Sequence, residues 1–527
     1  MSEKTEEIRP DLKAVIERHS FGLDENRPEA VEKRKAKNQR TARANVGEFF
    51  DRGEYIEYGA LAVAAQRGRR PIEELIMRTP ADGLIAGIGS VNGDIFPPEK
   101  SRCMVLAYDY TVLAGTQGFF NHKKMDRMLK VAYEQKIPLV LFGEGGGGRP
   151  GDVDAIGVMI AGLDLSTFYS FARLSGHVPL IGVVSGPCFA GNAALLGCCD
   201  VIIAAKNANI GMGGPVMIEG GGLGTFRPEE IGPIDVQTKN GVVDIEVADD
   251  VEMVAAARKY LSYFQGPLPK WEAGDQKVLR NLIPENRRRV YDVRAVIHAL
   301  ADQNSFLEMR PKFGPGIVTG LIRIEGRPFG VIANDCRHMG GAIEAEAADK
   351  AVRLIRICDT HGLPILALID TPGFMVGPEI EKRAQVRHVC RMFVVGSHVT
   401  VPYFSVVLRR GYGLGAMAMA AGGFHESVFT VAWPTGEFGA MGLEGAVKAG
   451  FRRELEAIAD PQERQAFYEK MVAELYERGR AMNMASYLEI DAVIDPAETR
   501  KWLIRGLDSI PPERLKPGRR PVFVDPW

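Results

Sequence analysis

The chain carries one stretch of sequence twice, in the same order, and this duplication limits the folds open to it. Each half contains a strand-like segment with a hairpin turn, followed by two apolar segments that each carry a proline. The paired segments are residues 83–87 and 316–320 (GLIAG and GIVTG), 137–141 and 363–367 (IPLVL and LPILA), and 178–180 and 400–403 (VPL and TVPY). Similarity of this kind indicates two copies of one structural unit.

Each copy is predicted to be an α/β unit. Short segments rich in Val, Ile and Leu alternate with helical patterns, such as those over 124–135 and 350–360. This alternation is typical of buried, largely parallel strands joined by crossover helices. A similar lead-in precedes both copies, and the joint between them falls between about 266 and 294. We therefore predict a helical extension over 1–45, a first domain over 46–280 and a second domain over 281–527.

Composition narrows the possible partners. At 527 residues and 46% hydrophobic content, the chain is long enough for two cores. Lys plus Arg (65) nearly balance Asp plus Glu (67), so no basic field indicates nucleic acid. No apolar run approaches the ~20 residues that span a bilayer, residues 1–40 lack a signal-peptide core, and no C-x-x-C pair predicts a metal site. We expect a cytoplasmic protein without nucleic-acid or membrane partners.

Two glycine-rich turns are the best candidates for chemistry. Residues 143–149 (GEGGGGR) follow an apolar strand, where consecutive glycines can turn backbone N–H groups toward one oxyanion. A flexible turn is the simpler interpretation of such a run. Phosphate binding is disfavoured, because neither G-x-x-x-x-G-K-[ST] nor a well-placed G-x-G-x-x-G is present. In the second copy, residues 410–417 (RGYGLGAM) follow a strand and lead into a small-residue helix, whose first amides favour negative charge.

Side-chain catalysts are less evident than these backbone donors. The sequence has no G-x-S-x-G elbow and no H-E-x-x-H motif, which leaves nucleophilic and metal-hydrolytic mechanisms without candidates. Asp370, Glu379 and Glu381 could act as acids or bases, but roles in shaping a turn are favoured. His122 and His338 are interpreted as ordinary polar residues. Two oxyanion sites, one in each copy, remain the chemical hypothesis.

Several motifs in order make the chain resemble a known family. The first half reads GEFFDRGEYIE, DGLIAGIGSVNG, YDYTVLAGTQGFFNHKK and GGGGR, and the second reads YDVRAVIHALADQNSFLEM, GRPFGVIAND, IDTPGFMVGPEIE, GYGLGAMAM, AWPTGEFGAMGLEGAV and IDAVIDPAETR. Together they resemble the carboxyltransferase (β) subunit of propionyl-CoA and related biotin-dependent acyl-CoA carboxylases, from about residue 49 to 507. The resemblance implies two fused crotonase-like (ClpP/crotonase) domains in a homo-hexamer, with active sites between the first domain of one subunit and the second of another.

The resemblance also implies the site residues and the reaction. Carboxybiotin on a separate carrier protein would donate a carboxyl group to the α carbon of an acyl-CoA, with a biotin carboxylase as the further partner and no metal in this chain. The implied donors to the thioester enolate are the amides of Gly146 and Gly147, and those to the biotin ureido oxygen are the amides of Leu414 and Gly415. The implied substrate-binding residues beside them are Gly148, Arg149, Tyr412, Gly413 and Met417.

The sequence departs from the family at several of these positions. Gly145 stands where the family usually has serine, Pro150 follows the arginine of the first turn, and Val389 replaces a glycine. Leu414 also replaces a glycine, which a backbone donor tolerates. Met417 replaces the aspartate of propionyl-CoA-type enzymes, so the reaction class is retained while the acyl substrate is left open.

Two alternatives remain open at this point. One is the carboxyltransferase component of a biotin-dependent acyl-CoA decarboxylase, which runs the same transfer in reverse. The other is a non-catalytic scaffold that keeps the crotonase fold, for which Leu414 and Val389 are the best support.

Overall fold

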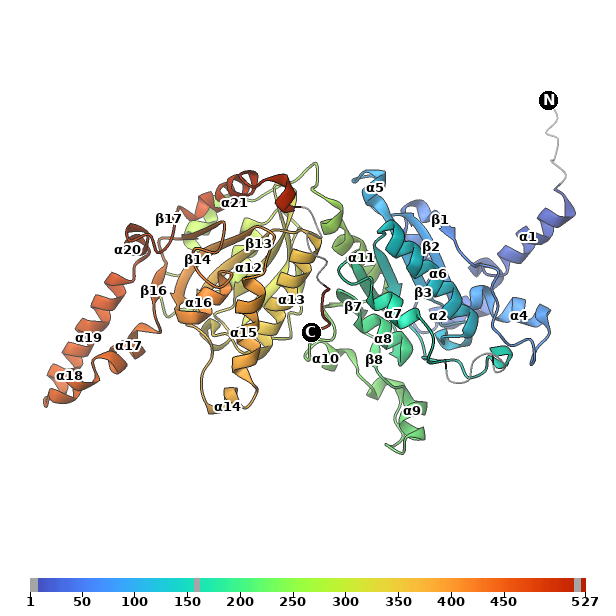
Figure 1. Cartoon of the computed structure of the whole chain (residues 1–527), viewed down its shortest axis with the longest axis horizontal. Coiled ribbons are helices and arrows are strands. Elements are labelled where there is room, and N and C mark those ends of the chain that lie inside the picture. The colour runs from blue at the N-terminus through green and yellow to red at the C-terminus, as the bar shows by residue number, and fades with distance from the viewer. Residues whose placement is uncertain (1–7, 156–161, 516–522) are drawn as a thin grey trace, which may run out of the picture. The chain divides into compact units, whose positions relative to one another are not determined.

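The structure is a computed structural model that describes residues 8–155, 162–515 and 523–527. Its contacts divide the chain into two compact units, with the division between Gln265 and Gly266. Figure 1 draws the first unit in blue to green and the second in yellow to red. Each unit is described by itself.

The first unit is built on a seven-stranded sheet in the order β1-β2-β3-β4-β5-β7-β9. The strands β1 to β3 pair antiparallel and the later neighbours pair parallel. A separate parallel pair, β6 and β8, lies beside it. The bounds are β1 Tyr55–Glu57, β2 Leu84–Ser90, β3 Arg102–Tyr108, β4 Leu139–Phe142, β5 Leu180–Val184, β6 Pro187–Phe189, β7 Val201–Ala205, β8 Asn209–Gly211 and β9 Ile245–Val247.

The second unit repeats this plan with the order β10-β11-β12-β13-β14-β15-β17, and β16 pairs with the end of β14. Its first three strands are again antiparallel and the others parallel. The bounds are β10 Leu307–Met309, β11 Ile317–Ile324, β12 Arg327–Asn334, β13 Ile365–Thr371, β14 Tyr403–Tyr412, β15 Phe429–Ala432, β16 Glu437–Gly439 and β17 Ala492–Val493.

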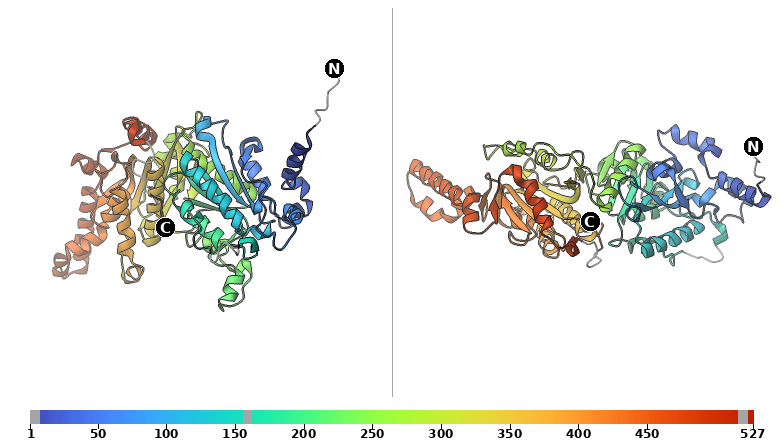
Figure 2. Two further views of the ribbon diagram at one scale, coloured as in Figure 1. Left: turned by 45° about the vertical axis from the view of Figure 1, so that its right-hand side comes forward. Right: turned by 90° about the horizontal axis from the view of Figure 1, so that it is seen from above.

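Both units contain many helices, including those that connect the parallel strands, as Figures 1 and 2 show. In the first unit they are α1 Pro10–Ser20, α2 Pro28–Lys35, α3 Ala42–Phe49, α4 Ile72–Arg78, α5 Pro98–Ser101, α6 Phe119–Gln135, α7 Thr167–Ala172, α8 Gly191–Gly197, α9 Pro215–Gly220, α10 Ile234–Gln237 and α11 Asp250–Gln265. In the second unit they are α12 Val293–Leu300, α13 Ala345–His361, α14 Pro378–Glu381, α15 Gln385–Gly396, α16 Gly413–Met419, α17 Leu443–Gly450, α18 Arg452–Ala457, α19 Pro461–Arg478, α20 Ala481–Ser486 and α21 Thr499–Asp508. The helix α19 buries no residue, as expected for a charged, solvated helix.

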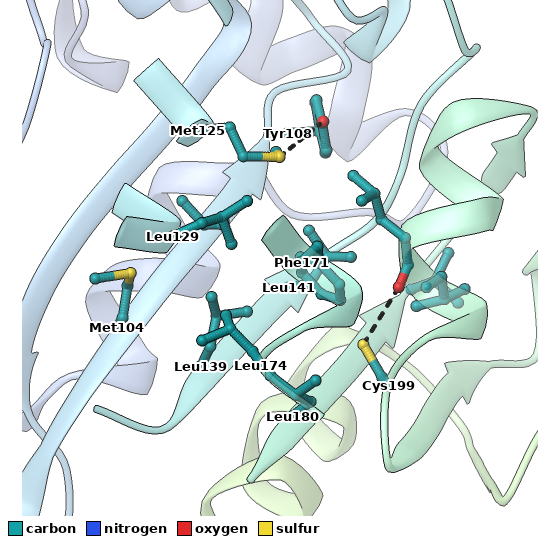
Figure 3. Packing of buried hydrophobic residues seen from close by; sticks show 14 of the residues in the cluster. Met104, Tyr108, Met125, Leu129, Leu139, Leu141, Phe171, Leu174, Leu180 and Cys199 are labelled. Atoms are coloured by element: carbon teal, nitrogen blue, oxygen red, sulfur yellow. Dashed lines mark hydrogen bonds between the residues drawn. The ribbon is translucent and has the colours of Figure 1, made fainter. Parts of the chain in front are cut away.

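The central strands of the first sheet, β4 and β5, have no polar side chain, as expected for parallel strands that helices cover on both faces. In β4 and β5 every residue is buried. Figure 3 shows one face of the first core, where Met125 and Leu129 of α6 and Phe171 of α7 lie near Leu139 and Leu141 of β4. Packing of this kind fixes the carboxyl ends of the strands, from which the glycine-rich turns emerge.

The predicted duplication is confirmed in detail. The helices α6 and α13 both have 17 residues, and each follows the antiparallel part of its sheet. Both copies also begin with a short edge strand, β1 or β10. The fold is therefore the duplicated α/β fold that the sequence predicted.

The division of the chain falls earlier than the predicted boundary at 280/281. The Leu268 N–H donates to the Gly326 carbonyl (2.9 Å), and Leu279 joins the core of the second unit. The connecting segment therefore belongs with the second copy. The predicted N-terminal extension contains α1, α2 and the start of α3, which runs on to Phe49. Among the helices of the described ranges, none is both long and apolar enough to cross a bilayer.

Candidate active site

The first glycine-rich turn leaves β4 at the carboxyl edge of the first sheet. The Gly146 N–H donates to the Ala114 carbonyl (3.0 Å), and the Gly147 N–H donates to Oδ1 of Asn192 (3.2 Å). Gly147 has a φ of +86°, a conformation that favours glycine. Both predicted donors are thus hydrogen-bonded within the fold, and their role as oxyanion donors stays a prediction. The exposed Gly148 N–H has no acceptor among the described residues.

Arg149, at the end of this turn, links it to neighbouring segments. Its guanidinium donates to a carboxylate oxygen of Asp82 and to the Thr116 carbonyl (2.7 Å), and its side chain is almost fully buried. A buried Arg–carboxylate pair with a further backbone acceptor fixes the guanidinium in place. The structure therefore gives Arg149 a clamping role, and direct contact with substrate stays a prediction.

A second ion pair lies under the same turn. Arg34 of α2 forms two hydrogen bonds of 2.7 Å with the carboxylate of Glu144, and both side chains are buried. Burial raises the pKa of Glu144, and the charge of Arg34 opposes that shift. The N-terminal helices thus contribute to the support of the first glycine-rich turn.

The second glycine-rich turn joins β14 to α16. Tyr412 is buried and its hydroxyl donates to Oε1 of Glu437 on β16 (3.0 Å). Gly413 has a φ of +57°, and a Cβ placed on it would lie 2.7 Å from the Ala440 carbonyl oxygen. Only glycine fits there without strain. These contacts set the direction in which α16 begins.

The first amides of α16 have no intrahelical acceptor, and Tyr412 offers no side-chain cap. They include the predicted donors Leu414 and Gly415. The Leu414 side chain is 60% exposed, so it projects away from the core. A Cβ on Gly415 would lie 2.7 Å from the Gly373 backbone, so this position has no room for a side chain.

Met417 lies on the same helix and lines a cavity of about 870 Å³ in the second unit. The side chain is 39% exposed. Apolar side chains from five further segments make up much of the lining: Phe424, Phe438, Leu443, Leu475 and Met484. A volume of this size is within the usual range for sites that bind small molecules.

Two side chains that hold the turns after β4 and β13 were not predicted from the sequence. Asn192 of α8 is fully buried and bonds to Gly147 of the first turn and to Gly115 in the segment before α6. In the second unit the Thr371 hydroxyl accepts from the Gly373 N–H (3.1 Å) in the turn after β13. No sequence motif marks either residue, because each contact depends on how the chain packs.

The other candidates from the sequence have structural contacts. Asp370 is fully buried between the guanidinium groups of Arg409 and Arg410. Burial would raise the pKa of Asp370, but the two positive charges outweigh it and hold the pKa below its usual value. Glu379 and Glu381 are exposed on α14, in agreement with turn roles.

The two histidines each have a local partner. His122 contacts the Thr167 hydroxyl (2.9 Å), and His338 contacts Glu344 (2.9 Å). Val389 is buried on α15. Within residues 8–155, 162–515 and 523–527, no group of three or more His, Cys, Asp or Glu side chains could hold a metal ion.

The chain matches a family model described as the carboxyl transferase domain over residues 33–515. An uncharacterised carboxylase of Bacillus subtilis (strain 168) is 34% identical over 441 residues, which cover 82% of this chain and 84% of that protein. The methylmalonyl-CoA carboxyltransferase 12S subunit of Propionibacterium freudenreichii subsp. shermanii is 28% identical over 499 residues, covering 92% and 91%.

Two solved structures agree with these matches. A transcarboxylase 12S structure has a TM-score of 0.81 and 27% identity, and the match covers 94% of each chain. The structure of a single-chain, multi-domain long-chain acyl-CoA carboxylase has a TM-score of 0.90 and 55% identity over 94% of this chain. This chain spans about half (49%) of that single-chain protein. The predicted duplicated fold and acyl-CoA carboxyltransferase class are confirmed, and the chain belongs to the carboxyl transferase domain family.

Proposed function

We propose that this protein transfers a carboxyl group from carboxybiotin on a carrier protein to the α carbon of a long-chain acyl-CoA. The substrate class is inferred from the largely apolar cavity that Met417 lines. A carboxylate in place of Met417 would disfavour binding of an apolar acyl chain there. The 55% identity to a long-chain acyl-CoA carboxylase supports the same class. Displacement of water from such a lining would favour longer chains, by about 0.8 kcal/mol for each buried CH₂.

The first unit holds the thioester in this proposal. Formation of an enolate places negative charge on the thioester oxygen, and backbone N–H groups stabilise it without any side-chain base. The exposed Gly148 amide is the donor that needs no rearrangement, whereas Gly146 and Gly147 would exchange an internal acceptor for the substrate. The clamp made by Arg149 keeps these donors preorganised. Loss of one such donor typically costs about 3–4 kcal/mol.

The second unit receives the biotin in this proposal. The uncapped amides of Leu414 and Gly415 suit a carbonyl-type acceptor such as the ureido oxygen, and the absence of a side chain at Gly415 leaves the backbone accessible. Bound biotin would supply the carboxyl group and the basic nitrogen. The chain itself orients the two reactants and excludes water, and the cofactor supplies the acid–base chemistry.

Biotin-carrying partners follow from this chemistry. We expect a biotin carboxyl carrier and a biotin carboxylase, whether on other chains or on further domains, and a homo-hexamer like the 12S core. Light scattering on the active protein should then give six times the 57.7 kDa of this chain. A stable, active monomer would contradict the assembly but leave the chemistry untouched.

The test of the function is a panel of acyl-CoAs assayed with carrier, carboxylase, ATP and labelled bicarbonate. We expect acid-stable label in the acyl-CoA product, with kcat/KM rising from acetyl- and propionyl-CoA to chains of palmitoyl length. A preference for propionyl-CoA would refute the substrate class. No transfer to any member of the panel, with an active carrier and carboxylase, would favour the scaffold alternative.

A further inference from the structure

The turns after β4 and β13 each contain a backbone N–H that donates to a side chain, but the two side chains come from different elements. The bridge between Gln117 and Gly148 in the first unit is repeated by that between Ile343 and Phe374 in the second. Likewise, the bridge between Gly145 and Cys188 is repeated by the pair Thr371 and Gly411. These registers make Gly147 equivalent to Gly373, Gly145 equivalent to Thr371, and Asn192 equivalent to Gly415.

The turn after β13 is satisfied from within. The Thr371 hydroxyl accepts from the Gly373 N–H at 3.1 Å, so the residue that ends the strand also holds the turn. The facing position on α16 is Gly415, and a Cβ there would lie 2.7 Å from the Gly373 backbone. In the second unit the accepting side chain therefore belongs to the turn, and the facing position on α16 is a glycine.

The turn after β4 has the reverse arrangement. The Gly147 N–H donates to Oδ1 of Asn192 (3.2 Å), while Nδ2 of Asn192 donates to the Gly115 carbonyl (3.2 Å). A Cβ on Gly145 would lie only 2.1 Å from Nδ2 of Asn192. In the first unit the accepting side chain therefore belongs to α8, and the facing position on the turn is a glycine. Position 145 therefore has no room for a side chain, because the added Cβ would also lie 2.3 Å from the Gly115 carbonyl oxygen.

We infer that Asn192 is the positioning residue of the acyl-CoA side, having taken over the role that a hydroxyl on the turn has in the second unit. Its fully buried amide joins two backbone groups, one on each of two segments that frame the first turn. Without it, the Gly147 N–H and the Gly115 carbonyl both lose their partner, and such buried groups are costly to leave unsatisfied. The turn that presents Gly148 would then lose its fixed geometry.

This inference rests on the proposed function and makes a specific kinetic claim. A displacement of a positioned group by about 1 Å can cost about 100-fold in rate, because preorganisation acts on the transition state. We therefore expect Asn192→Gly to lower kcat for transfer by about 10- to 100-fold. The KM for acyl-CoA and the KM for the carboxylated carrier should each change less than about threefold, because the bulk of both binding surfaces remains.

The experiment compares three forms of the assembled enzyme: wild type, Asn192→Gly and Gly197→Ala. Gly197 is on the same helix, and no atom lies near an added Cβ there, so Gly197→Ala should retain the wild-type kcat. Oligomeric state and thermal unfolding check that all three forms are folded.

The outcomes separate the two claims. Wild-type kcat in Asn192→Gly, or a loss no larger than the loss of folded protein, would overturn the role of Asn192. A loss of kcat in Gly197→Ala as large as that in Asn192→Gly would also overturn it, because any change in α8 would then have the same effect. If wild type itself transfers no carboxyl group to any acyl-CoA, the proposed function fails and the comparison of kcat values does not arise.

Discussion

The two units share a backbone plan but differ in what supports each turn at the carboxyl edge of its sheet. In the first unit Glu144 pairs with Arg34 of the N-terminal helices, whereas in the second Asp370 pairs with Arg409 and Arg410 of the neighbouring strand. Both acids are buried, and both occupy the same place relative to the turn. The turn after β4 is therefore supported by a segment outside the repeat, and the turn after β13 is supported by a strand of its own sheet.

Both units satisfy the same buried polar groups, although with side chains from different positions. A buried N–H at Gly147 or Gly373 needs an acceptor, but that acceptor need not come from the same position in both copies. Likewise a buried carboxylate needs a cation, whatever element supplies it. The two units therefore share their backbone geometry, but the side chains that support each turn come from different elements.

The largest expected effect comes from Gly147→Val. The φ of +86° is strained for a β-branched residue, and a Cβ would lie 2.7 Å from Cβ of Ala190. We expect transfer to fall by up to about 1,000-fold with assembly retained. Gly197→Ala, at the end of α8 with no atom near the added Cβ, is the matched control and should retain activity. Undiminished turnover in Gly147→Val would remove this turn from the site.

Gly415→Asn tests the second unit in the same way. It places on α16 the residue that α8 carries at the equivalent position, while Thr371 still occupies the turn. Because the new Cβ lies 2.7 Å from the Gly373 backbone, the turn must move, and we expect about a 100-fold loss of transfer. The control is Gly450→Asn at the end of α17, where no atom lies near the added Cβ. Near-normal transfer would mean that the two helix positions are not equivalent.

Met417→Asp tests the cavity of the second unit. A carboxylate in this lining should lower kcat/KM for long acyl-CoAs relative to propionyl-CoA by at least about tenfold. Biotin-dependent decarboxylation of a carboxylated short acyl-CoA should change little. Met482→Asp provides the control, because that methionine is 62% exposed and lies outside the cavity lining. An unchanged preference profile would show that Met417 does not border the acyl chain.

The smallest expected effect concerns two equivalent buried lysines. Nζ of Lys124 donates to the carbonyls of Gly59, Ala81 and Leu84, whereas Nζ of Lys350 has one weak acceptor, at 3.5 Å, in the part of the chain that the structure describes. Burial lowers the pKa of Lys124 to about 8 and that of Lys350 to about 7.

We expect Lys124→Met to lower the free energy of unfolding by about 1–3 kcal/mol, since three carbonyls lose a donor. Lys350→Met should cost less than about 1 kcal/mol, because replacement of a poorly paired buried charge by an apolar side chain is often neutral. Urea unfolding of the two variants measures the difference. Equal losses would mean that the carbonyl contacts of Lys124 contribute nothing.

Much of the fold could be predicted because duplication and strand patterning are visible in the chain. The repeated glycine and proline positions located the strands β2, β4, β11 and β13 before any geometry was known. The positions of the two turns followed from the same patterns. What remained hidden was the hydrogen bonding: Asn192 lies 45 positions from Gly147 in the chain, and only the packing of α8 brings them together. The clamp from Arg149 to Asp82 was hidden for the same reason.

The most direct test of the proposed reaction is single-turnover transfer from a pre-carboxylated carrier protein to palmitoyl-CoA, followed by rapid quenching. We predict that label appears in the acyl-CoA as it leaves the carrier, that Gly147→Val and Gly415→Asn each suppress this transfer, and that neither abolishes assembly. Transfer at the wild-type rate in both variants, or loss of label from the carrier with none reaching palmitoyl-CoA in wild type, would contradict it.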